Sequence, residues 1–365
     1  MSRVLMIAGG GTGGHIYPAI AIAQEFVSRG EGRNVIFVGT ARGLETTIVP
    51  KAGFPLELIS VAGLQGKGPL ELLKNLALLP VGFFQAWGLL GRHRPGVVLG
   101  VGGYASGPLL AVARLRGIPT AIHEQNAYPG LTNRILARFV QTVAVAFPGA
   151  LPRLNRADGV ITGNPVRKEF FTAAASRAVG SASDPIRLLI FGGSQGSKTI
   201  NDAMTGALLF LSRLKGRLEI VHQTGPKELE HVREAYRTSA FSDARVVPYL
   251  DPISGEIAAA DLVVCRAGAM TIGELAAVGR PAILIPFAAA TNNHQEENAR
   301  AVESAGGAVV ITESQLTAER LGSAIAEIAG DPARARTMGA GALRLAAPDA
   351  TRKIVDLLEK IDRSE

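Results

Sequence analysis

A glycine-rich segment near the N-terminus leads into a histidine that could act in catalysis. The sequence GGGTGGH occupies residues 9–15, directly after a short apolar run. Glycines let a backbone approach a ligand closely, and a helix N-terminus favours an anion. His15 would stand at the start of that helix, where a pKa of about 6.5 suits a general base. The alternative for His15 is a hydrogen bond that only closes the loop.

A second glycine loop, residues 192–197, follows another apolar run and precedes another helical pattern. It lacks the G-x-x-x-x-G-K spacing of a P-loop. Its backbone N–H groups, its helix start and the Ser194 hydroxyl would still suit a phosphate or diphosphate. The alternative is a tight turn without a ligand.

Three further polar groups stand where apolar runs end. Glu274 lies about one turn into a helical pattern, where it could accept both hydroxyls of a ribose or only favour the helix start. The segment HEQN, residues 123–126, places four polar side chains after a strand, which is costly unless they are paired or functional. Arg167 follows Gly163-Asn164-Pro165 and could reach a diphosphate, or be a surface arginine.

The elements that must position these groups are apolar runs separated by helical patterns. Most runs are continuous rather than alternating, which is typical of parallel strands buried on both faces. This predicts an α/β fold built of βαβ units. The expected strands are Val4–Ala8, Val35–Val38, Leu56–Ile59, Val97–Leu99, Thr120–Ile122, Ile186–Phe191, Leu218–Val221, Arg245–Val247, Leu262–Val264, Ala282–Ile285 and Ala308–Ile311.

The two halves of the chain begin alike, each with a strand that runs into glycines and then a helix. We therefore predict two Rossmann-like, doubly wound parallel-sheet domains, residues 1–163 and 164–345. Residues 346–365 are expected to form a C-terminal helix that packs back on the first domain. Ligands of open α/β sheets bind outside the carboxyl ends of the strands, so a deep cleft between the domains is the expected site.

Composition excludes several classes of protein. In 365 residues, 47% are hydrophobic and 19% charged, which excludes a disordered or coiled-coil chain. The single cysteine, Cys265, excludes a disulfide framework and a multi-cysteine metal site, and no other metal-binding motif is present. No acid follows the second strand at Gly39-Thr40, which argues against NAD. The first apolar run is too short for a signal peptide, so we expect a cytoplasmic protein.

Positive charge is concentrated in the first half of the chain. Residues 1–164 carry 15 Lys and Arg against 7 Asp and Glu, whereas residues 165–365 carry 23 against 24. An anionic membrane surface is the favoured partner, because aromatic residues are only 5% and no nucleic-acid motif is present. Residues 75–91 lack any charge but include Pro80, and they are too few to span a bilayer. They would form a buried crossover helix or a helix partly exposed to lipid.

Six segments together resemble the MurG family of peptidoglycan N-acetylglucosaminyltransferases. In chain order they are GGGTGGH (9–15), GGYASGP (102–108), HEQN (123–126), GNPVR (163–167), GGSQG (192–196) and CRAGAMTIGE (265–274). The resemblance implies a GT-B fold that works without cofactor or metal. It also implies inverting transfer of GlcNAc from UDP-GlcNAc to the C4 hydroxyl of undecaprenyl-diphospho-MurNAc-pentapeptide (lipid I), which gives lipid II and UDP.

The resemblance also implies a location and partners. We expect a peripheral protein on the cytoplasmic face of the cell inner membrane, which meets other cell-wall synthesis and division proteins and no nucleic acid. His15 is the implied base, with Glu124 in reserve. The implied UDP-GlcNAc contacts are Thr12, Gly13, Gly14, Asn126, Arg167, Ser194, Leu250, Ala269, Met270, Thr271, Ile272, Gly273, Glu274 and Gln295. Asn293 stands where family members often carry an acid, which removes any carboxylate role there.

Two alternatives remain open from the sequence. One is another GT-B enzyme, either a lipid glycosyltransferase with a different acceptor or a UDP-GlcNAc 2-epimerase. An epimerase would release free product without a lipid acceptor. The other is a non-catalytic membrane scaffold, which would not need His15, Ser194 and Glu274 to converge on one site.

Overall fold

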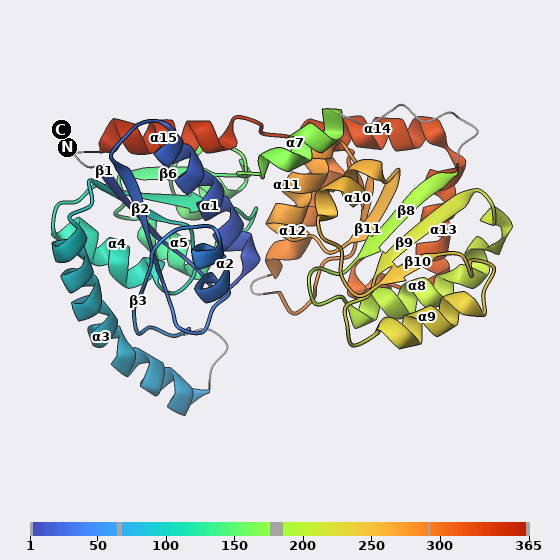
Figure 1. Cartoon of the computed structure of the whole chain (residues 1–365), viewed down its shortest axis with the longest axis horizontal. Coiled ribbons are helices and arrows are strands. Elements are labelled where there is room, and N and C mark those ends of the chain that lie inside the picture. The colour runs from blue at the N-terminus through green and yellow to red at the C-terminus, as the bar shows by residue number, and fades with distance from the viewer. Residues whose placement is uncertain (1–2, 64–67, 176–184, 291–292, 363–365) are drawn as a thin grey trace. The chain divides into compact units, whose positions relative to one another are not determined.

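A computed structural model describes residues 3–63, 68–175, 185–290 and 293–362 (Figure 1). The chain divides into two compact units. The N-terminal unit comprises Met1–Val166 together with Ala347–Glu365, and the C-terminal unit comprises Arg167–Ala346.

The N-terminal unit is built on a parallel sheet with the strand order β3-β2-β1-β4-β5-β6-β7. The order reverses between β1 and β4, and ligands of doubly wound sheets bind outside the carboxyl ends of the strands at such a point. The first glycine loop leaves β1 at this place. The strands are β1 (Arg3–Ala8), β2 (Arg33–Gly39), β3 (Leu56–Leu58), β4 (Val97–Gly100), β5 (Thr120–Glu124), β6 (Thr142–Val145) and β7 (Val160–Ile161).

Helices cover both faces of this sheet because its strands are apolar on both sides. In β1, Leu5 and Ile7 enter one core with α1 and α15, while Met6 and Ala8 enter the other with α3 and α4. The helices of the unit are α1 (Gly13–Ser28), α2 (Glu45–Lys51), α3 (Pro69–His93), α4 (Ser106–Leu115), α5 (Leu131–Leu136), α6 (Ala150–Leu154) and α15 (Ala350–Ile361).

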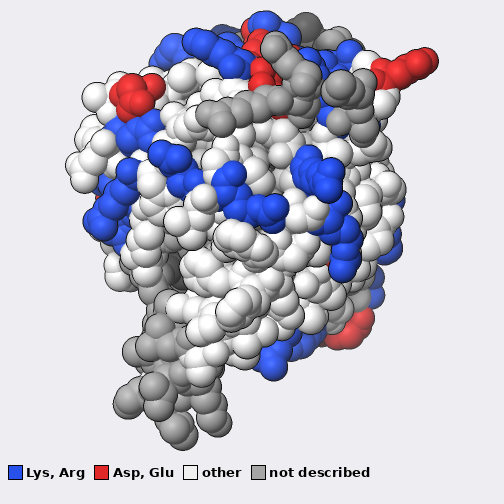
Figure 2. All heavy atoms as spheres, turned by 90° about the vertical axis from the view of Figure 1, so that its left-hand side faces the viewer, with Lys and Arg blue, Asp and Glu red and all other residues white. Residues whose placement is uncertain are grey.

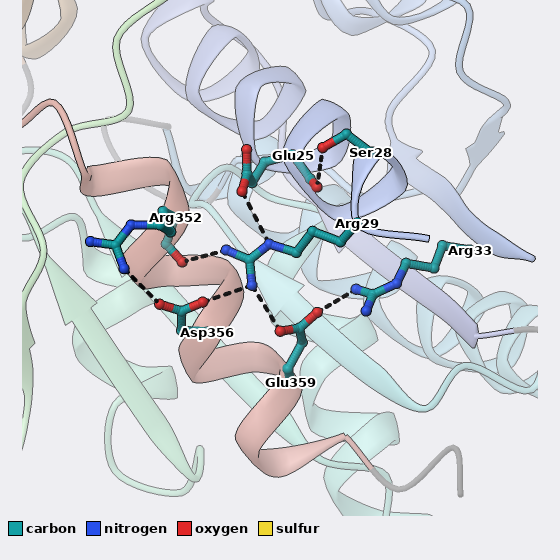
Figure 3. Close-up of polar contacts among 7 residues, drawn as sticks. All are labelled: Glu25, Ser28, Arg29, Arg33, Arg352, Asp356 and Glu359. Atoms are coloured by element: carbon teal, nitrogen blue, oxygen red, sulfur yellow. Dashed lines mark hydrogen bonds and ion pairs between the residues drawn. The ribbon is translucent and has the colours of Figure 1, made fainter. Parts of the chain in front are cut away.

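Helix α15 packs on α1 although the whole of the other unit, Arg167–Ala346, lies between them in the sequence. Its residues Ile354, Val355 and Leu358 are fully buried in the core beside α1, and this burial is the main stabilising contribution. Polar contacts then set the register of the two helices. Figure 3 shows Arg29, directly after the end of α1, reaching Asp356 at 2.7 Å and Glu359 at 2.8 Å on α15.

The C-terminal unit repeats the plan with the strand order β10-β9-β8-β11-β12-β13, again all parallel. Its order reverses between β8 and β11, and the second glycine loop leaves β8 there. The strands are β8 (Ile186–Phe191), β9 (Leu218–Gln223), β10 (Arg245–Val247), β11 (Leu262–Cys265), β12 (Ala282–Leu284) and β13 (Ala308–Val310).

The helices of the C-terminal unit flank this sheet, and α8 and α13 enclose a core with β8 and β9. They are α7 (Lys168–Ala175), α8 (Lys198–Leu211), η1 (Ser212–Leu214), α9 (Leu229–Arg237), α10 (Ile253–Ala259), α11 (Ala269–Val278), α12 (His294–Ser304), η3 (Glu313–Gln315), α13 (Ala318–Gly330) and α14 (Pro332–Leu343).

The predicted fold class is confirmed, and each expected strand is present within two residues at either end. Strands β6 and β7 were not predicted from the sequence. Strand β6 is a four-residue run that begins with Thr142, and β7 is a two-residue edge strand whose side chains are exposed. Strand β5 also extends to Glu124, so His123 and Glu124 lie within the strand rather than after it.

Candidate active site

The first glycine loop is held from below by a buried carboxylate. Glu45, the first residue of α2, is only 1% exposed. Its Oε2 accepts a hydrogen bond from the Gly11 N–H at 2.8 Å. Its Oε1 accepts from the Thr40 N–H at 2.9 Å and from the Thr40 hydroxyl at 3.0 Å. A Cβ on Gly10 or Gly43 would overlap this side chain, so glycine at both positions makes room for the carboxylate.

His15 lies in the first turn of α1 and is half-buried. Its Nδ1 is 3.1 Å from the Gly10 carbonyl oxygen. Because a carbonyl only accepts, Nδ1 donates, and the neutral ring then carries its lone pair on Nε2. Gly102 has φ +95°, and a Cβ there would lie 2.9 Å from Nε2. Glycine at that position therefore allows both the turn after β4 and the placement of the ring.

The segment from His123 to Asn126 is a buried hydrogen-bonded cluster at the end of β5. Burial lowers the pKa of His123 to about 4, so its ring is neutral, and Nε2 contacts the Gly163 carbonyl at 3.2 Å. Glu124 is 1% exposed. It accepts from the Asn126 N–H at 2.9 Å and the Asn126 amide at 3.1 Å. Its other oxygen accepts from the Gly130 N–H at 3.1 Å and from the Asn133 amide at 2.9 Å. Glu124 thus fixes Asn126.

The remaining predicted residues of the N-terminal unit surround the start of α1. Thr12 precedes the helix and is exposed, and its hydroxyl makes no cap hydrogen bond. Gly13 and Gly14 form the first helical positions. The turn after β4 reaches the same loop, because a Cβ on Gly103 would contact the Gly10 backbone at 2.8 Å. The loops after β1 and β4 therefore meet at the point where the strand order reverses.

The second glycine loop is braced by a carboxamide rather than a carboxylate. Gln223, at the end of β9, is 1% exposed, and its Nε2 donates to the Gly193 carbonyl at 2.8 Å. Gly193 and Gly196 have φ values of +97° and +74°, which favour glycine. Ser194 is exposed on the outside of the loop. Because the brace takes a carbonyl, it leaves the loop N–H groups to other partners.

Arg266 ties this loop to its neighbours. Its NH2 donates to the Ser197 hydroxyl at 2.8 Å and pairs with Glu313 at 2.6 Å. Its NH1 donates to the Ile285 carbonyl at 3.2 Å, and its guanidinium carbon lies 5.2 Å from the centre of the Phe287 ring. Ser197 in turn caps α8 by accepting from the Ile200 N–H at 3.3 Å. The cation thus stands beside the second glycine loop.

Glu274 and Arg167, predicted for the ribose and the diphosphate, contact each other. Glu274 Oε1 lies 3.2 Å from Arg167 NH2, and the Glu274 side chain is 12% exposed. Burial raises the pKa of Glu274 to about 7, against the opposing effect of Arg167. Arg167 also pairs with Glu169 at 3.0 Å. A ligand that bound both groups would exchange this ion pair for its own contacts.

The other predicted donor residues lie at the carboxyl edge of the same sheet. Gln295, in the first turn of α12, accepts from the Phe287 N–H at 3.0 Å through Oε1. Leu250, after β10, is buried. At the start of α11, Ala269, Met270 and Ile272 are buried, while Thr271 and Gly273 are half-buried. Since β8, β11 and β12 are neighbours, Ser194, Glu274 and Gln295 share one edge. Within the described residues, no group of three or more His, Cys, Asp or Glu could hold a metal ion.

Comparisons with known proteins identify the family of this chain. Residues 5–145 match the glycosyltransferase family 28 N-terminal domain, and residues 187–354 match its C-terminal domain. The chain is 48% identical to the UDP-N-acetylglucosamine--N-acetylmuramyl-(pentapeptide) pyrophosphoryl-undecaprenol N-acetylglucosamine transferase of Anaeromyxobacter sp. (strain K), covering 98% of this chain and 93% of that protein. It is 47% identical to the Myxococcus xanthus protein of the same name, covering 98% and 92%. The chain belongs to the MurG family.

A solved MurG structure shows the same fold. The crystal structure of Acinetobacter baumannii MurG aligns with a TM-score of 0.81 at 31% identity, covering 99% of this chain and 100% of that one. The predicted family and GT-B fold are therefore confirmed. Three residues of this MurG-family chain were not among the predicted site residues, namely the buried Glu45 and Gln223 and the half-buried Arg266. The glycines at 39, 43 and 10 around a single acid were the available signal for Glu45.

Proposed function

We propose that this chain transfers GlcNAc from UDP-GlcNAc to the C4 hydroxyl of lipid I, giving lipid II and UDP for peptidoglycan synthesis. The observation that carries this is near-half identity over 98% of the chain to curated N-acetylglucosamine transferases. Their name states both the donor and the undecaprenol-linked acceptor.

The donor would bind to the C-terminal unit. The Glu274 carboxylate, 12% exposed at the start of α11, suits the two ribose hydroxyls. The second glycine loop with Ser194, the start of α8 and Arg167 suit the diphosphate, because they offer N–H groups, a hydroxyl and a cation. The uracil would lie against Leu250 and residues 269–273, and the sugar against Gln295. Thr12, Gly13, Gly14 and Asn126 stay predicted sugar contacts of the N-terminal unit.

His15 is the proposed base. As the acceptor C4 oxygen attacks the anomeric carbon, Nε2 takes its proton, and the bond from that carbon to the UDP oxygen breaks. The charge left on UDP would be stabilised by the second glycine loop and Arg167. Glu124 is less suited to this step, because four donors already occupy its two buried oxygens. Its proposed role is to hold Asn126.

The N-terminal unit would dock on an anionic membrane through α3 and α4. Phe84 is 79% exposed, Trp87 53% and Leu115 76%. Together with Pro80, Phe83 and Val112 they line a hollow of about 520 Å³. Such exposed apolar groups mark an interaction surface. Within the described residues, no helix is long and apolar enough to cross a bilayer.

Basic side chains border this apolar surface. Arg116 lies 5.1 Å from the centre of the Trp87 ring and donates to its carbonyl at 2.9 Å. Arg92, Arg94 and Arg114 are exposed at the adjoining ends of α3 and α4. Figure 2 shows Lys and Arg side chains beside a broad uncharged area on this side of the molecule. Each cation near an anionic surface contributes about 1 kcal/mol, which suits reversible peripheral binding at the inner membrane.

The reaction is tested with purified protein, labelled UDP-GlcNAc, a lipid I analogue and EDTA. We expect a labelled lipid-linked disaccharide and one UDP per transfer. UDP released without acceptor would instead indicate an epimerase or hydrolase. UDP-GlcNAc binding without any turnover would indicate a different acceptor or a scaffold.

Membrane docking is tested by sedimentation with phosphatidylglycerol vesicles. Phe84→Ser is expected to weaken binding about tenfold, since burying such a side chain contributes about 1.5–3 kcal/mol. The matched control is Leu209→Ser on α8, which removes an equally exposed apolar side chain from the C-terminal unit. Equal effects of the two substitutions would contradict docking through α3.

A further inference from the structure

Glu45 is a buried acid for which the proposed transfer has so far assigned no role. Its three hydrogen-bond donors all come from loops that follow β1 and β2, namely the Gly11 N–H, the Thr40 N–H and the Thr40 hydroxyl. Within the part of the chain that the structure describes, no Lys or Arg forms an ion pair with it. A buried carboxylate without a cation is costly, so these donors must be well placed to retain it.

Two hydrogen bonds connect Glu45 to His15 through the first glycine loop. Glu45 holds Gly11, which has φ +88°, by its N–H. The adjoining residue, Gly10, presents its carbonyl to His15 Nδ1 at 3.1 Å. The direction of that carbonyl depends on the peptide between Gly10 and Gly11, and the N–H of the same peptide is the one that Glu45 binds. The Glu45 carboxylate therefore binds the N–H, and the His15 imidazole the C=O, of one and the same peptide group.

We propose that Glu45 is a positioning residue that fixes the tautomer and orientation of His15 by holding the Gly10–Gly11 peptide. This rests on the proposed function, because the orientation of His15 affects rate only if His15 takes the acceptor proton. The Gly11 N–H is already bound by Glu45, so this donor of the first glycine loop is not available to a ligand.

Glutamine cannot replace Glu45 in this role. Both carboxylate oxygens accept from a backbone N–H, one from Gly11 and the other from Thr40. A carboxamide has one oxygen and one NH2 group, so one of these N–H groups would face another donor. Glu45→Gln therefore keeps the size of the side chain and removes one of the two backbone hydrogen bonds that it accepts.

The kinetic test compares Glu45→Gln with Glu57→Gln, a half-buried acid on β3 of the same unit that binds His93. We expect kcat of Glu45→Gln to fall on the order of 10- to 100-fold, with KM for UDP-GlcNAc unchanged. In a His15→Gln background the same substitution should cost nothing further, since the two act as a unit. A full additional loss in that background, or an unchanged kcat in the single variant, would overturn the proposal.

The structural test reads the imidazole directly and does not depend on transfer activity. Nitrogen-15 NMR of the six histidines, with His15 assigned by its loss in His15→Gln, should show a proton on Nδ1 in the unmodified protein. Glu45→Gln should mix the two tautomers. If that variant does not fold, Gly43→Ala serves instead, because its Cβ would overlap the Glu45 carboxylate. An unchanged His15 spectrum in a folded variant would refute the positioning role, whereas failed transfer by the unmodified protein would refute only the proposed function.

Discussion

The two glycine loops occupy the same place in their sheets but are braced in opposite ways. Under the first loop, Glu45 accepts the Gly11 N–H. Under the second, Gln223 donates to the Gly193 carbonyl. Glu45 carries a negative charge and occupies an N–H group of its loop. Gln223 is neutral and occupies a carbonyl group of its loop.

A shared loop shape therefore does not imply a shared ligand. The second loop has the neutral Gln223 amide beneath it and Arg266, itself paired with Glu313 at 2.6 Å, beside it, so it suits an anion better than the first loop does. The acid beneath the first loop makes an anion less favourable there, and this loop holds His15 through the Gly10 carbonyl. One loop would bind the leaving group and the other would orient the base.

The largest effect should come from removing the group that the first loop presents. His15→Gln is expected to lower kcat by about 10²- to 10⁴-fold, the range attributed to general bases. Calorimetry should show unchanged UDP-GlcNAc affinity, because the charged residues proposed to bind UDP-GlcNAc, Arg167 and Glu274, lie in the C-terminal unit. A comparable loss of UDP-GlcNAc affinity would break the division of roles between the loops.

A smaller effect should come from placing a carboxylate beneath the second glycine loop, as Glu45 lies beneath the first. Gln223→Glu removes the donor to Gly193 and adds a buried charge, so UDP affinity should fall about tenfold or more. Gln223→Met is the control, because it removes the donor without adding charge. If both variants bind UDP equally, the charge beneath a loop does not decide its ligand.

The pH dependence of donor binding sharpens the electrostatic side of the comparison. Because burial places the pKa of Glu274 at about 7, its carboxylate is protonated as pH falls through that value. UDP-GlcNAc affinity should therefore fall up to about tenfold between pH 8 and pH 6, since protonation removes an acceptor. UDP-GlcNAc is the right probe because its diphosphate does not titrate in this range. Glu274→Gln should bind more weakly with a flat profile, and a sloping profile would point to another group.

The smallest effect should come from loosening the first brace. Thr40→Val removes only the hydroxyl that donates to Glu45 at 3.0 Å. We expect the free energy of unfolding to fall by about 1 kcal/mol and kcat to stay within about threefold. Urea denaturation measures the former. Thr46→Val, whose exposed hydroxyl contacts the Gly43 carbonyl, is the control and should cost less.

Most of the fold follows from local sequence. Buried parallel strands such as Ile186–Phe191 are continuous apolar runs, and their pattern alone places them. Strand β7 carries no such signal, because its two side chains are exposed at the sheet edge and only pairing with β6 defines it. Sequence also left open which face of residues 75–91 is covered. The structure buries Ala86 and Leu90 and exposes Phe84 and Trp87, which is an outcome of packing.

The candidate site divides in the same way. Glycine loops, His15 and Glu274 carry their chemistry in residue type and spacing, so sequence could propose them. Glu45 is 34 residues from the Gly11 N–H that it binds, and only the fold brings α2 beneath the loop. The mutual pairing of Arg167 and Glu274 was equally hidden, because each was predicted to face a ligand.

The return of α15 to the N-terminal unit has a consequence for biosynthesis. A nascent chain that has completed Met1–Val166 still lacks Ile354, Val355 and Leu358, which complete the core beside α1. Arg29 and Arg33 also lack their acidic partners on α15, Asp356 and Glu359, at that stage. The first half to leave the ribosome is thus the last to be finished, and it exposes an apolar surface on α1 throughout synthesis of the second half. A fragment that ends at residue 166 should therefore aggregate, because the apolar surface on α1 stays uncovered.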